Sequence, residues 1–358
     1  MPGSVYLAGR PLLRYYLLVG YVLLIVYASL SPFSGWQEQG LDFIEVMRAP
    51  LALTYTAFDA ASNVLAYLPL GLLLVLTARQ HWPPLRSLAV TLAVAVLLSL
   101  SLEYLQCYLP SRTASNVDVL TNALGALVGG ASALVLAARN GFLRLTHWRM
   151  ALFQRGRGVE FGLALGLLWL LAQINPAVPM LGNMFITETA QRLFVAMPQA
   201  SFSWEQSAAV ALHLLLVGLL LQTLLAKRDH APLALLLLLC TIAAAKFLAA
   251  ALLLKSWALL LWLNGEAMLG IACGMLMLWA LRRISRTLLL KLLLLTACTY
   301  LALTIWLLDS EAPTTVMRLY HWHYGHLYNY NALSRSVSVL FPLLVLGYLS
   351  QVWRRRDV

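Results

Sequence analysis

Charged side chains are scarce in this sequence, and their scarcity excludes most classes of soluble protein. Only 11% of the 358 residues are Asp, Glu, Lys or Arg, whereas 61% are hydrophobic and the mean hydropathy is +0.79. A soluble domain carries roughly 25% charged residues. The chain is therefore neither a soluble globular enzyme nor a disordered segment, and we interpret it as a polytopic membrane protein.

Cysteine is also scarce, and catalytic signatures are missing. The four cysteines are scattered singly, which argues against a disulfide framework and against a paired-cysteine metal site. The sequence has no G-x-S-x-G nucleophile elbow and no nucleotide-phosphate loop. The net charge of +11 comes with no basic stripe interleaved with aromatic residues, so nucleic acid is not an expected partner. We expect no cofactor and no metal.

Long apolar runs take the place of these features. About ten segments approach the roughly 20 apolar residues that a membrane-spanning helix needs. They lie near residues 12–30, 59–78, 87–105, 118–137, 159–173, 206–226, 231–251, 256–281, 287–308 and 334–352. Only helices satisfy their own backbone hydrogen bonds in lipid over runs of this length. The sequence therefore predicts an all-α, polytopic transmembrane helical bundle of about ten spanning helices.

The basic residues give this bundle an orientation. Most of the 25 lysines and arginines fall at alternate ends of the predicted helices, as the positive-inside rule requires of cytoplasmic loops. This pattern places both termini in the cytoplasm and the long loops 31–58, 174–205 and 309–333 outside.

A basic stretch at residues 139–158 divides the chain. It separates a four-helix domain at 1–138 from a six-helix domain at 159–358 that carries outward loops. Its mixture of Arg, Leu, Trp148 and Phe153 fits a helix lying on the inner leaflet, but a linker that only sets topology is the favoured interpretation.

Polar residues gather at the predicted outer ends of the second, third and fourth helices. Each helix carries a pair three or four positions apart, so the two members share one helix face, and a short loop adds an arginine. Such residues are costly in a membrane and need partners or a function. The set, called here the polar cluster, is Asp59, Asn63, Glu103, Gln106, Arg112, Asp118 and Asn122. We expect it to form one pocket.

One further feature and one alternative interpretation bear on this pocket. Gly125 and Gly129 form a small-xxx-small face that predicts close helix packing. An alternative to a ligand site is a structural lock, in which Asp59 and Asp118 cap helices and Arg112 pairs with Glu103.

Residues 59–71 (DAASNVLAYLPLG) and 101–130 (SLEYLQCYLPSRTASNVDVLTNALGALVGG) resemble the VanZ-like family of bacterial membrane proteins. The resemblance covers about residues 12–137, and the family's characteristic polar positions correspond to the polar cluster. It implies a multi-pass protein of the bacterial cytoplasmic (inner) membrane. The family's name-giving member is associated with resistance to the glycopeptide teicoplanin, but no agreed biochemical activity comes with the family.

The remaining helices carry two other candidates. Lys246 and Glu266 lie in neighbouring apolar runs and can form an ion pair inside the membrane or a proton relay. The outer loop 309–333 holds a group of aromatic and histidine residues that fits an interfacial belt, a sugar- or headgroup-binding surface, or a weakly indicated metal site. The residues singled out there are His321, Trp322, His323 and His326.

These observations favour an outward-facing pocket that binds or processes a lipid headgroup or a lipid-linked glycan intermediate of the envelope. In it, Arg112 would meet a phosphate or carboxylate, and Asp59, Glu103 or Asp118 would accept hydrogen bonds from sugar hydroxyls or act as a general base. The alternatives are a lipid transporter or flippase, and a non-enzymatic structural or resistance factor. The sequence assigns no reaction, catalytic residue, oligomeric state or protein partner.

Overall fold

A computed structural model describes residues 12–51, 57–182, 202–307, 319–321 and 325–354. These residues form helices without any β-strand. The helices of the first part are α1 (Leu13–Leu30), α2 (Phe43–Arg48), α3 (Ala57–Ala78), α4 (Pro84–Gln106), α5 (Asn116–Ala138) and α6 (Gly141–Leu152). Those that follow are α7 (Arg157–Ala172), α9 (Trp204–Leu224), η1 (Arg228–His230), α10 (Ala231–Leu253), η2 (Ser256–Ala258), α11 (Gly265–Ala280), α12 (Arg286–Leu307) and α13 (Gly325–Trp353).

The all-helical fold confirms the predicted fold class. Among the described residues, seven helices are long and apolar enough to cross a membrane, namely α1, α3, α4, α5, α9, α10 and α12. Three shorter apolar stretches, Gly158–Ala172, Gly265–Ala280 and Val339–Trp353, match the other expected spans. The chain is thus a multi-pass membrane protein, while the count of about ten spans stays a prediction.

The chain divides into two compact units, residues 1–149 and 150–358. The boundary between them falls within the basic stretch 139–158. Part of that stretch forms α6, none of whose residues is buried. The linker role and the inner-leaflet role of this helix both stay predictions.

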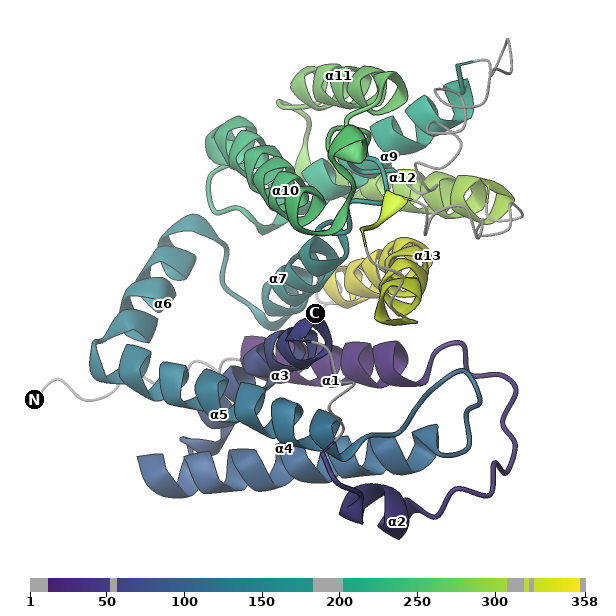
Figure 1. Cartoon of the computed structure of the whole chain (residues 1–358). Coiled ribbons are helices and arrows are strands. Elements are labelled where there is room, and N and C mark those ends of the chain that lie inside the picture. The colour runs from purple at the N-terminus through teal and green to yellow at the C-terminus, as the bar shows by residue number, and fades with distance from the viewer. Residues whose placement is uncertain (1–11, 52–56, 183–201, 308–318, 322–324, 355–358) are drawn as a thin grey trace, which may run out of the picture. The chain divides into compact units, whose positions relative to one another are not determined.

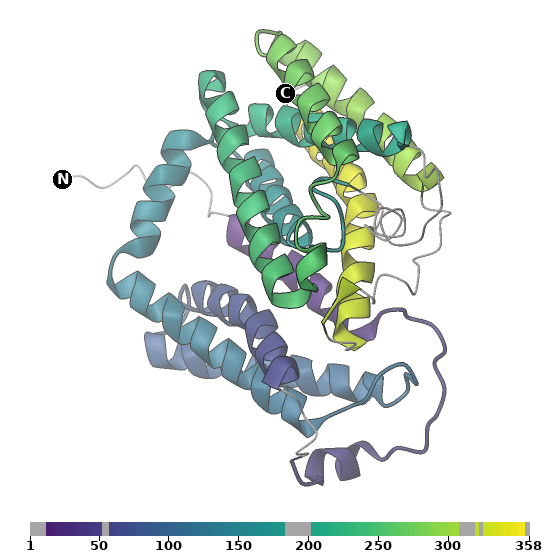
Figure 2. The ribbon, with the colours of Figure 1, turned by 45° about the horizontal axis from the view of Figure 1, so that its top comes forward.

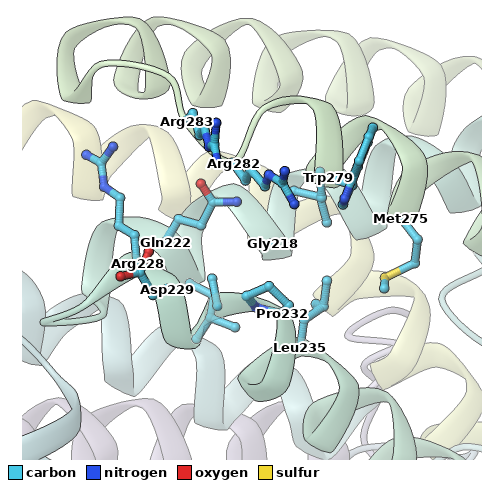
Figure 3. A pocket seen from close by; sticks show the side chains of 13 residues that line it. Gly218, Gln222, Arg228, Asp229, Pro232, Leu235, Met275, Trp279, Arg282 and Arg283 are labelled. Atoms are coloured by element: carbon cyan, nitrogen blue, oxygen red, sulfur yellow. The ribbon is translucent and has the colours of Figure 1, made fainter.

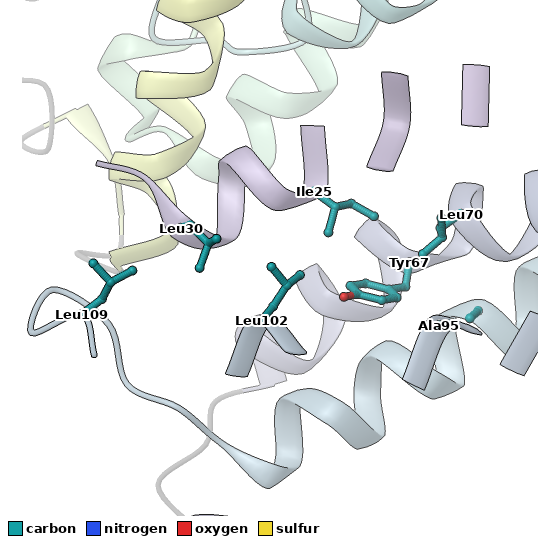
Figure 4. Packing of buried hydrophobic residues seen from close by; sticks show 8 residues of the cluster. Ile25, Leu30, Tyr67, Leu70, Ala95, Leu102 and Leu109 are labelled. Carbon is teal, nitrogen blue, oxygen red and sulfur yellow. The ribbon is translucent and has the colours of Figure 1, made fainter. Parts of the chain in front are cut away.

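The N-terminal unit is a bundle of α1, α3, α4 and α5, which run side by side in Figure 1. Its apolar core includes Ile25, Tyr67, Leu70 and Leu102 (Figure 4). Its outer surface is apolar as well, since Leu85 is 82% exposed. A bundle that is apolar both inside and outside fits a lipid environment.

Helices α3 and α5 are in direct backbone contact, and glycine makes this possible. A Cβ atom added at Gly125 would meet the backbone of Val64, and one added at Gly129 would meet the backbone of Leu68. Gly71 has the same relation to Ala126. The predicted small-xxx-small contact is therefore present, and it brings the first turns of α3 and α5 together.

The C-terminal unit is organised around α9, which contacts α7, α10, α11 and α12 and is buried along most of its length (Figure 2). Within the described residues, α13 packs on α7 and α12.

Two expectations for this unit are wrong in detail. Residues 256–264 do not continue an α-helix, because the Asn264 side chain caps α11 by accepting a hydrogen bond from the Ala267 amide at 2.9 Å. Helix α13 begins at Gly325, so the predicted loop 309–333 ends earlier than expected.

Loop 174–205, which the sequence places on the outer side of the membrane, contains one unexpected feature, and its side of the membrane stays a prediction. Its described beginning folds into the C-terminal unit, where Asn175 and Ala177 are completely buried and Leu181 is 1% exposed. This segment is apolar and contains Pro176 and Pro179, so it avoids helix but still favours the interior.

Candidate functional site

The structure places the whole polar cluster at one end of the N-terminal unit. This is the end at which α1 and α4 finish and α3 and α5 start, joined by the 107–115 loop. Asp59 and Asn63 lie in the first turns of α3, Glu103 and Gln106 in the last turn of α4, and Asp118 and Asn122 in the first turns of α5. Arg112 lies in the loop. The helical spacing alone brings each pair onto one face.

One side of the cluster joins α3 to α5. The Asn63 Nδ2 atom donates a hydrogen bond to Asp118 Oδ1 at 2.8 Å. This contact needs the close helix approach that Gly125 and Gly129 permit. Deeper in the bundle, Asn122 Nδ2 donates to Ser99 Oγ of α4 at 2.9 Å.

Another side of the cluster holds the end of α1. Arg112 Nη2 donates to the carbonyls of Ala28 at 2.6 Å and Ser31 at 2.9 Å. Gln106 Nε2 donates to the Ser29 carbonyl at 3.0 Å. The last carbonyls of a helix have no partner within the helix and carry its negative dipole, so a guanidinium is well suited to them.

Burial lowers the pKa of Arg112 to about 10, and the nearby Glu103 carboxylate opposes this shift. Arg112 is therefore still a cation at neutral pH. Its closest described contacts are carbonyl oxygens rather than the Glu103 carboxylate, with which it interacts electrostatically at longer range. Arg112 thus contacts the end of α1 instead of forming the direct Arg112–Glu103 pair considered from the sequence.

Glu103 is 3% exposed and holds the start of α5. Its Oε2 atom accepts a hydrogen bond from the Ser115 backbone amide at 2.8 Å. The Ser115 hydroxyl in turn caps the helix by accepting from the Val117 amide at 3.2 Å. The carboxylate therefore positions the loop and helix that carry Arg112 and Asp118.

Two buried polar atoms, one of the cluster residue Asn122 and one of Tyr67 beside it, form no hydrogen bond of good geometry among the described residues, although the Tyr67 hydroxyl lies close to the Ser99 side chain. They are the Tyr67 hydroxyl and the Asn122 Oδ1 atom. Tyr67 is 3% exposed and Asn122 is 6% exposed. Figure 4 shows the Tyr67 ring within the apolar core, with its hydroxyl on the side of Leu102. An unpartnered buried polar group costs about 1–3 kcal/mol, so a further polar group that partnered either atom would be stabilising.

The sequence interpretation missed Tyr67, Ser99 and Ser115. A signal for the first two was present, because Tyr67 follows Asn63 by four positions and Ser99 precedes Glu103 by four. Each therefore continues a polar helix face one turn deeper.

The C-terminal unit contains a second, separate group of buried polar residues. Lys246 is 1% exposed, and its Nζ atom donates to the carbonyls of Asn175 at 2.6 Å and Val178 at 2.9 Å. Both carbonyls belong to the non-helical segment that follows α7. Glu266 lies in the first turn of α11, where the helix dipole favours a carboxylate. The Lys246–Glu266 pair stays a prediction.

His213 forms the centre of this second group. The Trp169 indole donates to His213 Nε2 at 2.8 Å, while His213 Nδ1 lies 2.9 Å from the Leu181 carbonyl and 2.9 Å from the Tyr300 hydroxyl. An indole nitrogen only donates and a carbonyl only accepts, so the proton of the neutral imidazole is on Nδ1. Both ring nitrogens are occupied, which gives His213 a structural role.

The aromatic and histidine residues of loop 309–333 lie only partly within the described residues. His321 is exposed, and its backbone amide donates to the Leu253 carbonyl at 3.0 Å. Trp322 and His323 lie outside the described residues, and His326 is in the first turn of α13. Within the described parts of the chain, no three His, Cys, Asp or Glu side chains are grouped to hold a metal ion.

Comparison with known protein families gives a match to the N-terminal part of the chain. Residues 15–137 match the model of the VanZ/LLP1 family, which confirms that the N-terminal unit is VanZ-like. The search of curated proteins and the search of solved structures each find no match to the chain. The matched range ends before α6, so the family says nothing of the C-terminal unit.

Proposed function

Because residues 15–137 are VanZ-like, we propose that the N-terminal unit binds the polar headgroup of a lipid or lipid-linked envelope intermediate at the polar cluster. The observation that carries this proposal is the pair of unpartnered buried atoms, the Tyr67 hydroxyl and Asn122 Oδ1. The first lacks an acceptor and the second lacks a donor. A headgroup hydroxyl both donates and accepts, so groups of this kind can partner either atom.

The charges of the cluster favour the same class of ligand. Asp59 and Asp118 are half-buried carboxylates near the end of the bundle, and carboxylates accept hydrogen bonds from sugar hydroxyls or amines. Arg112 supplies a cation beside them. Its Nη2 atom is engaged by α1, so a phosphate or carboxylate of the ligand would meet its other N–H groups.

The proposed location is the outer face of the bacterial cytoplasmic membrane, with both termini in the cytoplasm. The positive-inside distribution of the basic loops supports this orientation. VanZ-like membership also links the proposal to glycopeptide resistance, which headgroup binding would serve by altering access to an envelope intermediate.

A structural lock is a second candidate, and the hydrogen bonds of the cluster favour it directly. Arg112 and Gln106 hold the end of α1, while Glu103 holds the start of α5. In this case the cluster stabilises the bundle and takes no ligand.

Native mass spectrometry of the gently solubilised full chain separates the two candidates. We compare wild type with Glu103→Gln, which keeps an oxygen to accept from the Ser115 amide but replaces the carboxyl group with an amide. Glu160→Gln, an acid-to-amide change in α7, is the matched control. The proposal predicts a lipid of defined mass that wild type and the control retain and folded Glu103→Gln loses.

Equal retention by all three proteins would contradict the ligand site, as would a wild-type protein that carries no defined lipid. A Glu103→Gln protein that fails to fold would favour the lock. Teicoplanin susceptibility of cells that express the same variants tests the link to resistance, and the proposal predicts the same ranking.

A further inference from the structure

The C-terminal unit contains a cavity of about 350 Å³ that belongs neither to the polar cluster nor to the His213 group. Figure 3 shows it between α9, the start of α10 and the end of α11. Its volume falls within the usual range for sites that hold small molecules or headgroups, which begins at about 300 Å³.

Three arginines give this cavity a positive charge. Arg228, Arg282 and Arg283 line it together with a single acid, Asp229. Arg228 Nη1 donates to the Ile284 carbonyl at 2.8 Å, which fixes that arginine and ties η1 to the turn after α11. The Arg282 guanidinium lies 4.9 Å from the centre of the Trp279 ring, a cation–π distance. The two contacts hold two of the three cations beside the cavity.

A buried amide adds an unmet hydrogen-bonding need. Gln222 lines the cavity and is 5% exposed, and its Oε1 atom has no partner among the described residues. This oxygen accepts hydrogen bonds, so it calls for a hydroxyl or N–H group on whatever occupies the cavity.

The remaining walls are apolar. Pro232 and Leu235 of α10 face Met275 and Trp279 of α11 across the cavity (Figure 3). Trp279 is 63% exposed, which places a large aromatic ring where the outer surface of the unit begins. Tryptophan in such a position is typical of the boundary between lipid tails and headgroups. The cavity therefore combines cations, one acceptor and a surface for hydrocarbon.

We propose that this cavity binds an anionic phospholipid whose headgroup carries a hydroxyl, with the phosphate between the arginines and the hydroxyl donating to Gln222 Oε1. The chemistry is that of phosphatidylglycerol. A zwitterionic choline lipid lacks both the net negative charge and the donor. The basic loops that form the cavity are cytoplasmic in the predicted orientation, so the lipid comes from the inner leaflet, where basic pockets between helices take anionic headgroups.

The test is the thermal stabilisation of the detergent-solubilised full chain as each lipid is titrated. A ligand that binds only the folded state raises its stability with concentration, so the midpoint gives an apparent affinity. We expect phosphatidylglycerol to stabilise the wild type at concentrations at which phosphatidylcholine does not. Soluble glycerol phosphate distinguishes a lipid site from a site for a free anion.

The variants are Arg282→Gln combined with Arg283→Gln, and separately Gln222→Leu. Lys227→Gln removes a neighbouring exposed charge that does not line the cavity and is the matched control. The arginine variant should weaken phosphatidylglycerol binding by at least about tenfold, since hydrogen bonds to charged groups are among the strongest. Gln222→Leu should weaken it less, and Lys227→Gln should leave it unchanged.

Three outcomes would overturn the proposal. They are equal stabilisation by both lipids, an arginine variant that behaves like Lys227→Gln, and binding of glycerol phosphate as strong as that of the lipid. Because both arginines are exposed, their loss leaves the fold intact even if Gln222→Leu does not fold. Glu103→Gln lies in the other unit and should bind phosphatidylglycerol normally, so failure of this proposal and failure of headgroup binding at the polar cluster are separable.

Discussion

The polar cluster of the N-terminal unit and the His213 group of the C-terminal unit differ in how their buried polar atoms are partnered. At the polar cluster, the Tyr67 hydroxyl and Asn122 Oδ1 form no hydrogen bond among the described residues. In the His213 group, both ring nitrogens of His213 and the ammonium of Lys246 are hydrogen-bonded. Gln222 Oε1, which lines the separate cavity of the C-terminal unit, is unpartnered as well.

This difference separates a ligand site from a structural centre. A saturated polar network fixes one arrangement of the chain, and here it holds the non-helical segment after α7 inside the unit. Buried polar atoms without hydrogen-bond partners lower the stability of the fold, and a ligand that partners them removes this cost. The polar cluster is accordingly a better candidate for a ligand site than the His213 group is.

The largest expected loss of stability comes from disrupting the α3–α5 contact next to the polar cluster. Gly129→Ala would put a Cβ atom against the backbone of Leu68, which cannot move aside as a side chain can. We expect a loss of about 3 kcal/mol of stability, or failure to fold, because overpacking is costly in a tight contact. Thermal unfolding in detergent, followed by size-exclusion chromatography, measures this.

Gly166→Ala in α7 is the control, since its added Cβ would meet nothing within 4 Å. Alanine favours helix over glycine, so this variant should be as stable as wild type or slightly more stable. A Gly129→Ala protein that unfolds at the wild-type temperature would contradict the direct backbone contact between α3 and α5.

A smaller loss is expected from the saturated centre of the C-terminal unit. Lys246→Met keeps the side-chain shape but leaves the Asn175 and Val178 carbonyls without their donor. The expected cost is about 2 kcal/mol, with no change in lipid retention by the N-terminal unit. Lys291→Met, at an exposed lysine of α12, should cost nothing measurable. If Lys246→Met lost lipid at unchanged stability, this would contradict the structural role of Lys246 and would indicate a role in lipid binding instead.

The smallest of these losses concerns the cap of α5. Ser115→Ala removes the hydroxyl that accepts from the Val117 amide, while the Ser115 backbone amide still donates to Glu103. We expect a stability loss of about 1 kcal/mol in thermal unfolding, the usual cost of an N-cap. Ser111→Ala, in the exposed part of the same loop, should show none. A loss as large as that of Gly129→Ala would mean that the loop depends on more than this cap.

Much of the N-terminal unit could be predicted from the sequence, because its features are local. Helical spacing places Asp59 with Asn63 and Asp118 with Asn122, and the glycine spacing predicts the α3–α5 contact. What could not be predicted is the role of Arg112. Its acceptors are backbone carbonyls at the end of α1, 81 and 84 positions away. Every residue has a backbone carbonyl, so the sequence pattern does not indicate which carbonyls a side chain will contact.

The C-terminal unit was harder to predict for a related reason. An apolar run indicates burial, but it does not distinguish a spanning helix from a non-helical segment held inside by Lys246. Pro176 and Pro179 indicated the end of a helix, whereas the burial of the segment depends on contacts with α9 and α10 that are distant in sequence.

The central claim is that the polar cluster keeps hydrogen-bonding capacity for a ligand, and Tyr67→Phe tests it most directly. The change removes only a buried hydroxyl, which lies near the Ser99 side chain but forms no hydrogen bond of good geometry among the described residues. Thermal unfolding and lipid retention by native mass spectrometry are measured on the same protein. Our account predicts that Tyr67→Phe unfolds at the wild-type temperature or above it, and that it retains less lipid. A variant that is less stable and retains the wild-type amount of lipid would contradict it, because the hydroxyl would then be part of the fold rather than of a binding site.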